Sequence, residues 1–423
     1  MRLTRELASS VNFIDGTIPP VREIVIVISD LYLAPGQTGA STDAGGGAGA
    51  IGTLPGFEHV ARFGQRRTIE GEGGWRPWLA RWLGRNDLAG VAPALIAAGA
   101  ADAAEPAASG AAAEAGRADR IGANLPVGAN APAAADASVA AQRPGASVWI
   151  ATPVHLIAGL TSLHLDRRSI LRLSPTDCEN FANDFSRTFA GSGLLLKPLA
   201  SGDFLLHGPA TLVGSTTEPA RALVADLEAS LPKGTDAKPL KRLGAELEMW
   251  LHATPLNETR QRRGEVSVST LWLWGGGPHV ASEVRAAAAA SGPHTPNAQL
   301  ALSFGTDPYL AGLWNLQGGR TNALPDDQLA SLFTSFPAAD GHARRAVLVT
   351  EVTPLLQSNP QWTVFDALAE LDRLYVSPVI DALRTGKVES VVLIANDVEV
   401  RVGRGDRLKF WRRRQSILTG LQS

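Results

Sequence analysis

The chain has 423 residues, 45% of them apolar, which is enough for one large domain or two ordinary ones. Its formal net charge of −2 argues against nucleic-acid binding through overall charge. A single cysteine, Cys178, excludes an internal disulfide and a cysteine-rich zinc site. Neither a secretory signal nor a long apolar run is visible, so we expect a cytoplasmic protein that does not enter the membrane.

The clearest predicted strand runs from Glu23 to Tyr32. Its continuous β-branched stretch is typical of a central strand that is buried on both faces. Asp30 lies at the end of this stretch, near the carboxyl edge of the predicted sheet, where α/β proteins usually place their chemistry. Asp30 is therefore a candidate functional residue, although capping of a turn is the commoner role for an aspartate in this position.

The composition changes after the first core segment, which we assign to residues 1–34. Alanine, glycine and proline dominate much of 35–146, and few large apolar residues are available there for a core. We interpret 35–146 as an insertion that is largely disordered over 90–144. Within it, the helical spacing of Leu79, Trp82 and Leu83 predicts a short helix that packs on the core.

The remainder of the predicted core spans 147–423 and begins with a buried strand at 147–156. A helix is expected to start at Ser174, with Pro175 at its first position, because serine caps helices and proline suits the first turn. Residues 194–196 and 203–207 resemble the two strands of a hairpin. We therefore expect a small peripheral sheet near 160–210.

A helix and a strand that end in three glycines form the most distinctive stretch of the chain. The helix is expected to end before Pro255, since proline disfavours helical backbone in the residue before it. The strand leads to Gly275, Gly276 and Gly277, and glycines allow a ligand to approach the backbone closely. Plain turn chemistry is the commoner role for such a loop, and neither the P-loop nor the dinucleotide-binding spacing is present.

Further strands alternate with helices toward the C-terminus, which predicts an α/β fold with a mainly parallel sheet. The expected strands are 299–305, 345–350 and 390–397, and the last of them ends in Asp397. Helices are expected at 281–290, from Asp307, and at 362–383 with a break near Pro378.

Two sequence blocks carry a resemblance to a known family. The block from His252 to Gly264 and the block from Ser269 to Gly277 resemble the bacterial regulatory protein RpfE-type family, as do shorter stretches at 152–156 and 410–413. That family is similar to the archaeal-type cofactor-independent phosphoglycerate mutases of the alkaline phosphatase superfamily. The resemblance covers roughly 20–34 and 147–414. It implies an alkaline-phosphatase-like sheet flanked by helices, in which Asp30 and Asp397 match metal-binding aspartates.

The sequence departs from that family where the metals would bind. A two-metal site needs several carboxylates and histidines, yet Asp397 is followed by Val398 and the eight histidines are scattered singly. We therefore expect a phosphoglycerate-mutase-like protein with a degenerate metal site, and with a regulatory or ligand-binding role. The alternative is an active mutase or related phosphatase that requires Mn²⁺ or Mg²⁺; otherwise no cofactor is expected.

The expected ligand is a phosphorylated small molecule, because arginine offers paired donors to phosphate. Its predicted contacts are Asn257, Arg260, Arg263, Trp274, Gly275, Gly276 and Gly277. Pairing of the two arginines with Glu258 or Glu265 on the surface is an equally good reading. A third possibility is a nucleic-acid-binding regulator that uses the basic residues of 401–414, but the near-neutral net charge disfavours it.

Overall fold

The computed structural model describes residues 21–32, 54–69, 71, 73–104, 146–159, 163–223, 227–278, 301–317, 319–325, 344–395 and 397–408. The helix expected at 281–290 and the basic residues beyond 408 lie outside these ranges. Within the described part, no helix combines the length and the apolar character needed to cross a bilayer.

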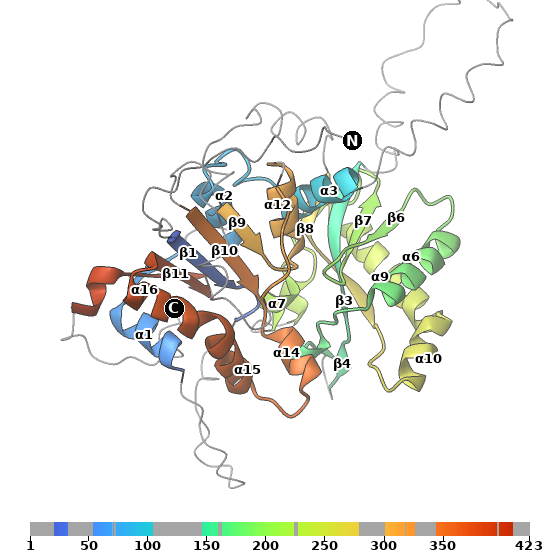
Figure 1. Ribbon diagram of the computed structural model, residues 1–423. Helices are drawn as coiled ribbons and strands as arrows, with labels where there is room; N and C mark the ends of the chain where they lie inside the picture. Colours follow the sequence, from blue (N-terminus) through green and yellow to red (C-terminus); the bar gives the residue numbers. More distant parts are fainter. Residues whose placement is uncertain are drawn as a thin grey trace, which may run out of the picture.

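A six-stranded, mostly parallel sheet forms one half of the fold (Figure 1). The central strand β1 (Val21–Ile28) pairs in parallel with β10 (Arg344–Thr350) and β11 (Val388–Ala395). Strand β9 (Ala301–Phe304) continues the parallel arrangement beside β10. At the opposite edge, β12 (Val398–Gly403) pairs antiparallel with β11, and β2 (Gln65–Thr68) pairs antiparallel with β12. The predicted α/β class with a mainly parallel sheet is confirmed.

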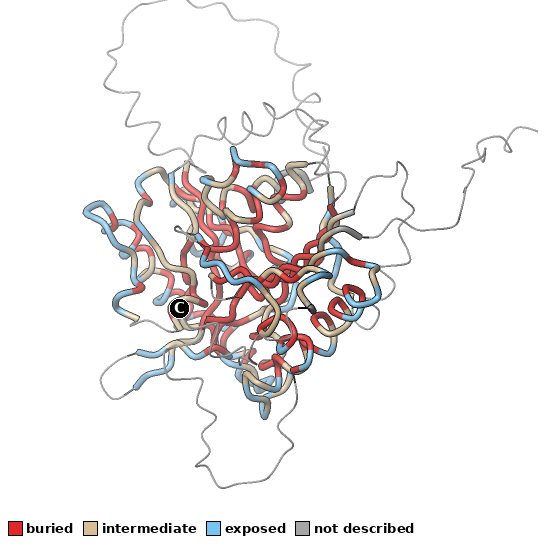
Figure 2. The backbone as a smooth tube through the Cα atoms, turned by 90° about the vertical axis from the view of Figure 1, so that its left-hand side faces the viewer, coloured by how far each residue is buried: buried red, intermediate tan, exposed pale blue. Residues whose placement is uncertain are grey.

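Helices cover both faces of this sheet, as the continuous apolar run of β1 requires. Ile24, Ile26 and Ile28 pack on one face, whereas Val25 and Val27 pack on the other. The helices on the first face are α1 (Pro55–Phe63), α15 (Val364–Leu371) and α16 (Ser377–Thr385), and those on the second are α2 (Trp75–Trp82) and α12 (Pro308–Asn315). The buried backbone is concentrated between these layers (Figure 2).

A four-stranded antiparallel sheet forms the other half, in the order β6 (Leu195–Pro198), β7 (Phe204–Gly208), β3 (Ser147–Val154) and β8 (Thr270–Pro278). The predicted hairpin is the β6–β7 pair, and β3 and β8 extend its sheet. Its helices are α6 (Pro175–Thr188), α9 (Lys238–Ala253) and α10 (Pro255–Arg262). A separate small pair consists of β4 (Ile157–Ala158) and β5 (Leu163–His164).

Part of the stretch expected to be an insertion belongs to the core. Residues 54–104 supply α1, β2, α2 and α3 (Pro93–Ala104), and β2 pairs with β12 in the main sheet. Helix α3 packs against both α12 and the four-stranded sheet. The alanine-rich composition misled the prediction here, because small side chains let α3 approach its neighbours closely. Residues 105–145 lie outside the described ranges.

The break expected in the helix at 362–383 is present and begins before the proline. A π-helical turn (Asp372–Val376) separates α15 from α16, and Pro378 lies in the first turn of α16. This position is physically reasonable because the proline ring clashes with the carbonyl group four residues earlier, at Leu374. The carboxylate of Asp372 accepts hydrogen bonds from the backbone N–H groups of Gly56 and Phe57 at 3.1 and 2.8 Å, so the break also anchors the start of α1.

The three glycines lie within a strand, whereas the sequence analysis placed them in a loop after it. They lie within β8, where one extra residue opposite β3 makes a bulge. Gly275 has a φ of 64°, which favours glycine, and a Cβ atom on Gly276 would overlap the backbone carbonyl oxygen of Val148. Close packing against β3 therefore explains Gly276, and the backbone conformation of the bulge explains Gly275.

We predict that Gly276→Ala destabilises the fold by about 2–3 kcal/mol, because the added methyl group has no room beside Val148. Gly244→Ala is the matched control, since Gly244 lies in α9 with open space around its Cβ position. That change is expected to stabilise the protein by about 0.5–1 kcal/mol. Urea unfolding measures both, and equal effects in the two variants would contradict the packing argument.

Candidate functional site

Four acidic residues gather at the carboxyl edge of the parallel strands. Asp30 follows β1, Glu351 follows β10, Asp397 follows β11, and Asp307 comes shortly after β9. Parallel strands bring their carboxyl ends to one edge of a sheet, which is where ligands of open α/β sheets bind. The sequence analysis named Asp30 and Asp397. The same strand-end rule, applied to every predicted strand, would also have found Glu351 and Asp307.

Arginine side chains reach these carboxylates from other elements, and the most deeply buried is Arg76 of α2. Its guanidinium group binds both carboxylate oxygens of Glu218 at 2.8 and 2.9 Å and Asp307 at 3.1 Å. The same group stacks on the rings of Trp75 and Trp274, 4.7 Å from each ring centre. Burial by itself lowers the pKa of Arg76, but the charges of Glu218 and Asp307 raise that pKa by a larger amount. The guanidinium group therefore stays charged.

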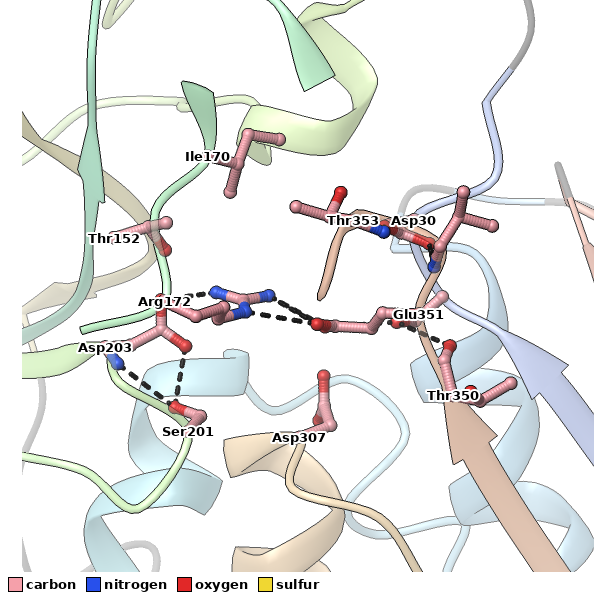
Figure 3. Close-up of polar contacts among 12 residues, drawn as sticks. Asp30, Thr152, Ile170, Arg172, Ser201, Asp203, Asp307, Thr350, Glu351 and Thr353 are labelled. Carbon is pink, nitrogen blue, oxygen red and sulfur yellow. Dashed lines mark hydrogen bonds and ion pairs between the residues drawn. The ribbon is translucent and has the colours of Figure 1, made fainter. Parts of the chain in front are cut away.

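Arg172 joins the two halves of the molecule (Figure 3). It donates to both carboxylate oxygens of Glu351, which follows a strand of the six-stranded sheet, with the shortest contacts at 2.8 Å. It also donates to Asp203, which precedes β7 of the four-stranded sheet, at 3.1 Å. The second oxygen of Asp203 accepts from the hydroxyl group of Ser201 at 2.7 Å. This network of contacts links the six-stranded sheet to the four-stranded sheet.

Arg221 forms a bidentate ion pair with Asp397, as Arg172 does with Glu351. It binds both carboxylate oxygens, one of them at 2.7 Å, and lies over the ring of Tyr32 at 4.7 Å. Asp397 has a φ of 59°, which is uncommon for a residue with a side chain. Gly74 packs against the pair so closely that a Cβ atom would overlap both partners. The backbone on both sides is therefore shaped around this ion pair.

Asp30 is held mainly by the backbone. Its two carboxylate oxygens accept hydrogen bonds from the N–H groups of Val352 and Thr353 at 2.7 and 2.8 Å. Arg167 donates to the backbone carbonyl oxygens of Asp30 and Tyr32, the latter at 2.7 Å, and lies 4.0 Å from the Asp30 carboxylate. The Asp30 carboxylate is thus bound at the start of the short helix α14 (Thr353–Ser358), and not within the turn that follows β1.

The residues at this edge do not fit a two-metal site. Within the described ranges, no group of three or more histidine, cysteine, aspartate or glutamate side chains is arranged to hold a metal ion. Asp30 and Asp397 lie at the same edge but are occupied by different partners, namely backbone amides and Arg221. A metal ion needs free carboxylate oxygens as ligands, and guanidinium groups already bind several of these oxygens.

A small cavity of about 30 Å³ lies among these side chains. This volume holds about two groups the size of a water molecule. Its charged lining consists of five carboxyl and two guanidinium groups, from Asp30, Asp203, Glu218, Asp307, Glu351, Arg76 and Arg172. Among the described residues, the buried Thr353 hydroxyl group has no hydrogen-bond partner, and neither does Nε of Arg76. The cavity is therefore polar, and carboxyl groups outnumber guanidinium groups in its lining.

The excess of carboxyl groups affects their protonation. Burial raises the pKa of Glu351 to about 7, since the charges of Asp30 and Asp203 add to burial and together outweigh Arg172. Burial also raises the pKa of Asp307, against the opposing effect of Arg76. Near neutral pH, Glu351 thus carries a proton for part of the time.

The other predicted ligand residues are spread over separate places. Arg260 and Arg263 both bind the carboxylate of Asp177, at 2.7 and 2.8 Å, and both contact Glu265. Pairing with Glu265 is the structural role that the sequence analysis weighed equally with phosphate binding. These arginines follow α9, near the start of β8, whereas the glycines lie at its far end (Figure 1).

Asn257 and Trp274 have distinct positions of their own. The Asn257 side chain donates to the carbonyl oxygens of Leu251 and Val268 and accepts from the N–H group of Val268, so it fastens α10 to the segment before β8. Trp274 lines the cavity and donates to the hydroxyl group of Thr152 at 3.0 Å. Of the seven predicted ligand residues, Trp274 is the one that lines the cavity.

Sequence reasoning missed the three arginines that define the site. Arg76 lies in helix α2, and Arg172 lies in a loop. Arg221 lies near the end of the short helix α7 (Pro219–Ala222). No spacing in the sequence marks them, because the carboxylates to which they donate hydrogen bonds are between 31 and 231 positions away along the chain.

Comparisons with known proteins find similarity to solved structures, two of which are described here. The PH0037 protein from Pyrococcus horikoshii aligns over 91% of this chain and 88% of its own, with 10% identity and a TM-score of 0.41. A cofactor-independent phosphoglycerate mutase from Thermoplasma acidophilum aligns over 91% and 90%, with 13% identity and a TM-score of 0.31. No protein-family model and no curated protein matches the chain. At these values, no site residue can be transferred from either structure.

We predict that Glu351 makes the protein less stable as the pH rises. Its pKa in the folded protein, about 7, lies above its ordinary value of 4.5. The folded state therefore binds this proton more tightly, and the stabilisation is present below pH 4.5 and lost as the pH rises through 7. The loss is on the order of 3 kcal/mol.

Glu351→Gln should remove this dependence, because the amide does not titrate. The test is urea unfolding of the protein and the variant at several pH values between 4.5 and 8. The difference in unfolding free energy between them should change across this window, since all other groups are shared. A constant difference would show that Glu351 titrates near its ordinary pKa in the folded protein.

Proposed function

We propose that this chain is a phosphoglycerate-mutase-like protein with a degenerate metal site and a regulatory or ligand-binding role. One observation carries the proposal. The acidic residues at the carboxyl edge, which a metal-dependent enzyme of this kind would use as ligands, are paired with arginine side chains or with backbone N–H groups. The RpfE-type resemblance of the sequence agrees with a regulatory role and remains part of the proposal.

Electrostatics favour this reading over an active enzyme. Arg76, Arg172 and Arg221 are fixed by bidentate contacts to carboxylates, and such pairs are strong hydrogen bonds. A divalent ion would have to displace a guanidinium group and leave a buried positive charge without a partner, which is strongly unfavourable. Arginine thus supplies positive charge that a metal would otherwise supply, but it cannot activate a nucleophile as a Lewis acid does.

A phosphorylated ligand has weaker support than the inactive scaffold. Arg260 and Arg263, the arginines expected to bind it, share Asp177 as their partner. The cavity at the carboxyl edge has more carboxyl than guanidinium groups, so a phosphate group would meet net repulsion there. Binding of such a ligand would require the arginines to exchange their carboxylate partners.

We predict that the purified protein shows no phosphoglycerate mutase turnover with Mn²⁺ or Mg²⁺, because no described group of side chains can hold the ion. Asp30→Asn is expected to leave this background unchanged. The measurements are metal content after purification and conversion of 3-phosphoglycerate at saturating Mn²⁺. Turnover that disappears in Asp30→Asn would contradict the proposal and establish a metal-dependent enzyme.

A further inference from the structure

Strand β2 forms one edge of the six-stranded sheet. It stands last in the order of the sheet and has β12 as its neighbour on one side. All four of its residues, Gln65–Thr68, are exposed. An exposed strand edge can pair with a further strand, and many proteins bind an extended peptide in this way. The outer side of β2 is therefore a candidate interaction surface.

The register of β2 shows which of its backbone groups point outward. The N–H group of Ile69 donates to the carbonyl oxygen of Asp397, beside the last pair of the ladder between β2 and β12, at 2.7 Å. Antiparallel ladders alternate between pairs that exchange hydrogen bonds and pairs that do not, so Arg67 also faces β12. The N–H and C=O groups of Arg66 and Thr68 consequently point away from the sheet. No other described segment hydrogen-bonds to them.

The side chains of Arg66 and Arg67 make this edge basic. They point to opposite faces of the sheet, so a strand laid along β2 meets a positive charge on each face. Neither arginine forms an ion pair within the described part of the chain. Glu399 lies opposite Arg67 in the ladder. Its carboxylate instead binds Trp78 at 3.0 Å and Arg401 at 3.3 Å, so the two positive charges of β2 remain available to a partner.

The same charges determine which kind of strand suits this edge. Pairing with the β2 edge of a second copy would bring arginines of both chains together, and like charges in neighbouring positions destabilise a sheet. Charged side chains on edge strands protect proteins from such self-association. An extended segment that carries glutamate or aspartate has the complementary charge. The edge thus disfavours its own copy and favours an acidic strand.

From these observations we infer that β2 binds an extended acidic segment of a partner protein, which joins the six-stranded sheet as a further strand. Backbone hydrogen bonds to Arg66 and Thr68 hold this strand, and the side chains of Arg66 and Arg67 select its carboxylates. The inference goes beyond the proposed function and does not depend on it, because the edge of β2 includes none of the residues expected to bind a metal or a phosphorylated ligand.

The test is fluorescence anisotropy of a labelled short peptide titrated with the full chain. The peptide has two adjacent glutamates between β-branched residues, so that one carboxylate faces each arginine. We expect it to bind at least about tenfold more tightly than the same peptide with lysines in place of the glutamates, since each opposite-charge pair across neighbouring strands stabilises a sheet. The difference should shrink as salt is added.

Three variants separate the backbone contribution from the charge. Thr68→Pro removes the outward N–H group and leaves the ladder with β12 in place, because edge strands tolerate proline there, and it should lose most of the binding. Thr68→Val is the matched control, since it keeps the N–H group and should bind as the unmodified protein does. Arg66→Glu combined with Arg67→Glu should reverse the preference and bind the lysine peptide. Urea unfolding shows that each variant is folded, and the charge reversal still tests the inference if Thr68→Pro is not.

The contrary outcomes are distinct. Equal binding of a glutamate peptide that is N-methylated at alternate positions, or unchanged binding in Thr68→Pro, would overturn strand addition, because both remove backbone hydrogen bonds. A single-stranded oligonucleotide that binds more tightly than the peptide, and loses affinity in the charge-reversed variant, would assign the arginines to nucleic acid instead. Metal-dependent turnover would overturn the proposed function and leave this inference in place.

Discussion

The buried guanidinium group of Arg76 is the contact on which the joint between the two halves depends. It is enclosed by the rings of Trp75 and Trp274 and binds Glu218 and Asp307. These partners come from α2, β8, the loop before α7 and the start of α12. Removing one partner of a buried ion pair leaves an uncompensated charge, so all four elements are constrained to remain together.

The same principle explains why the carboxyl edge is crowded with charge yet does not resemble a metal centre. Parallel strands deliver acidic residues to one edge whether or not a metal is present. Here the arginines of the facing elements neutralise most of that charge. The neutralisation is incomplete, so the charges of Asp30 and Asp203 add to burial and raise the pKa of Glu351. For the same reason, carboxyl groups outnumber guanidinium groups around the small cavity. The arginine-paired carboxylates and the small acidic cavity are thus two consequences of one charge distribution.

The sequence predicted local structure well and the site only in part. The β-branched run of β1, the Ser174 cap of α6 and the Asp307 cap of α12 are local patterns, and each is found as expected. The glycines of β8 were expected in a loop, because glycine occurs both in loops and where two strands pack closely. Asp30 could be placed at the sheet edge because it directly follows a strand. Its arginine neighbours could not, because their contacts depend on how distant segments pack.

The most direct test of the central claim is the free energy of unfolding of Arg76→Met, measured with urea beside Arg373→Ala. Arg373 pairs with Glu370 on an exposed helix surface, where such pairs contribute little. Loss of Arg76 would leave Glu218 and Asp307 buried without their cation, so the account predicts a loss of about 3–5 kcal/mol, against less than about 1 kcal/mol in the control. Equal, small losses in both variants would contradict the claim that this ion pair holds the two halves together.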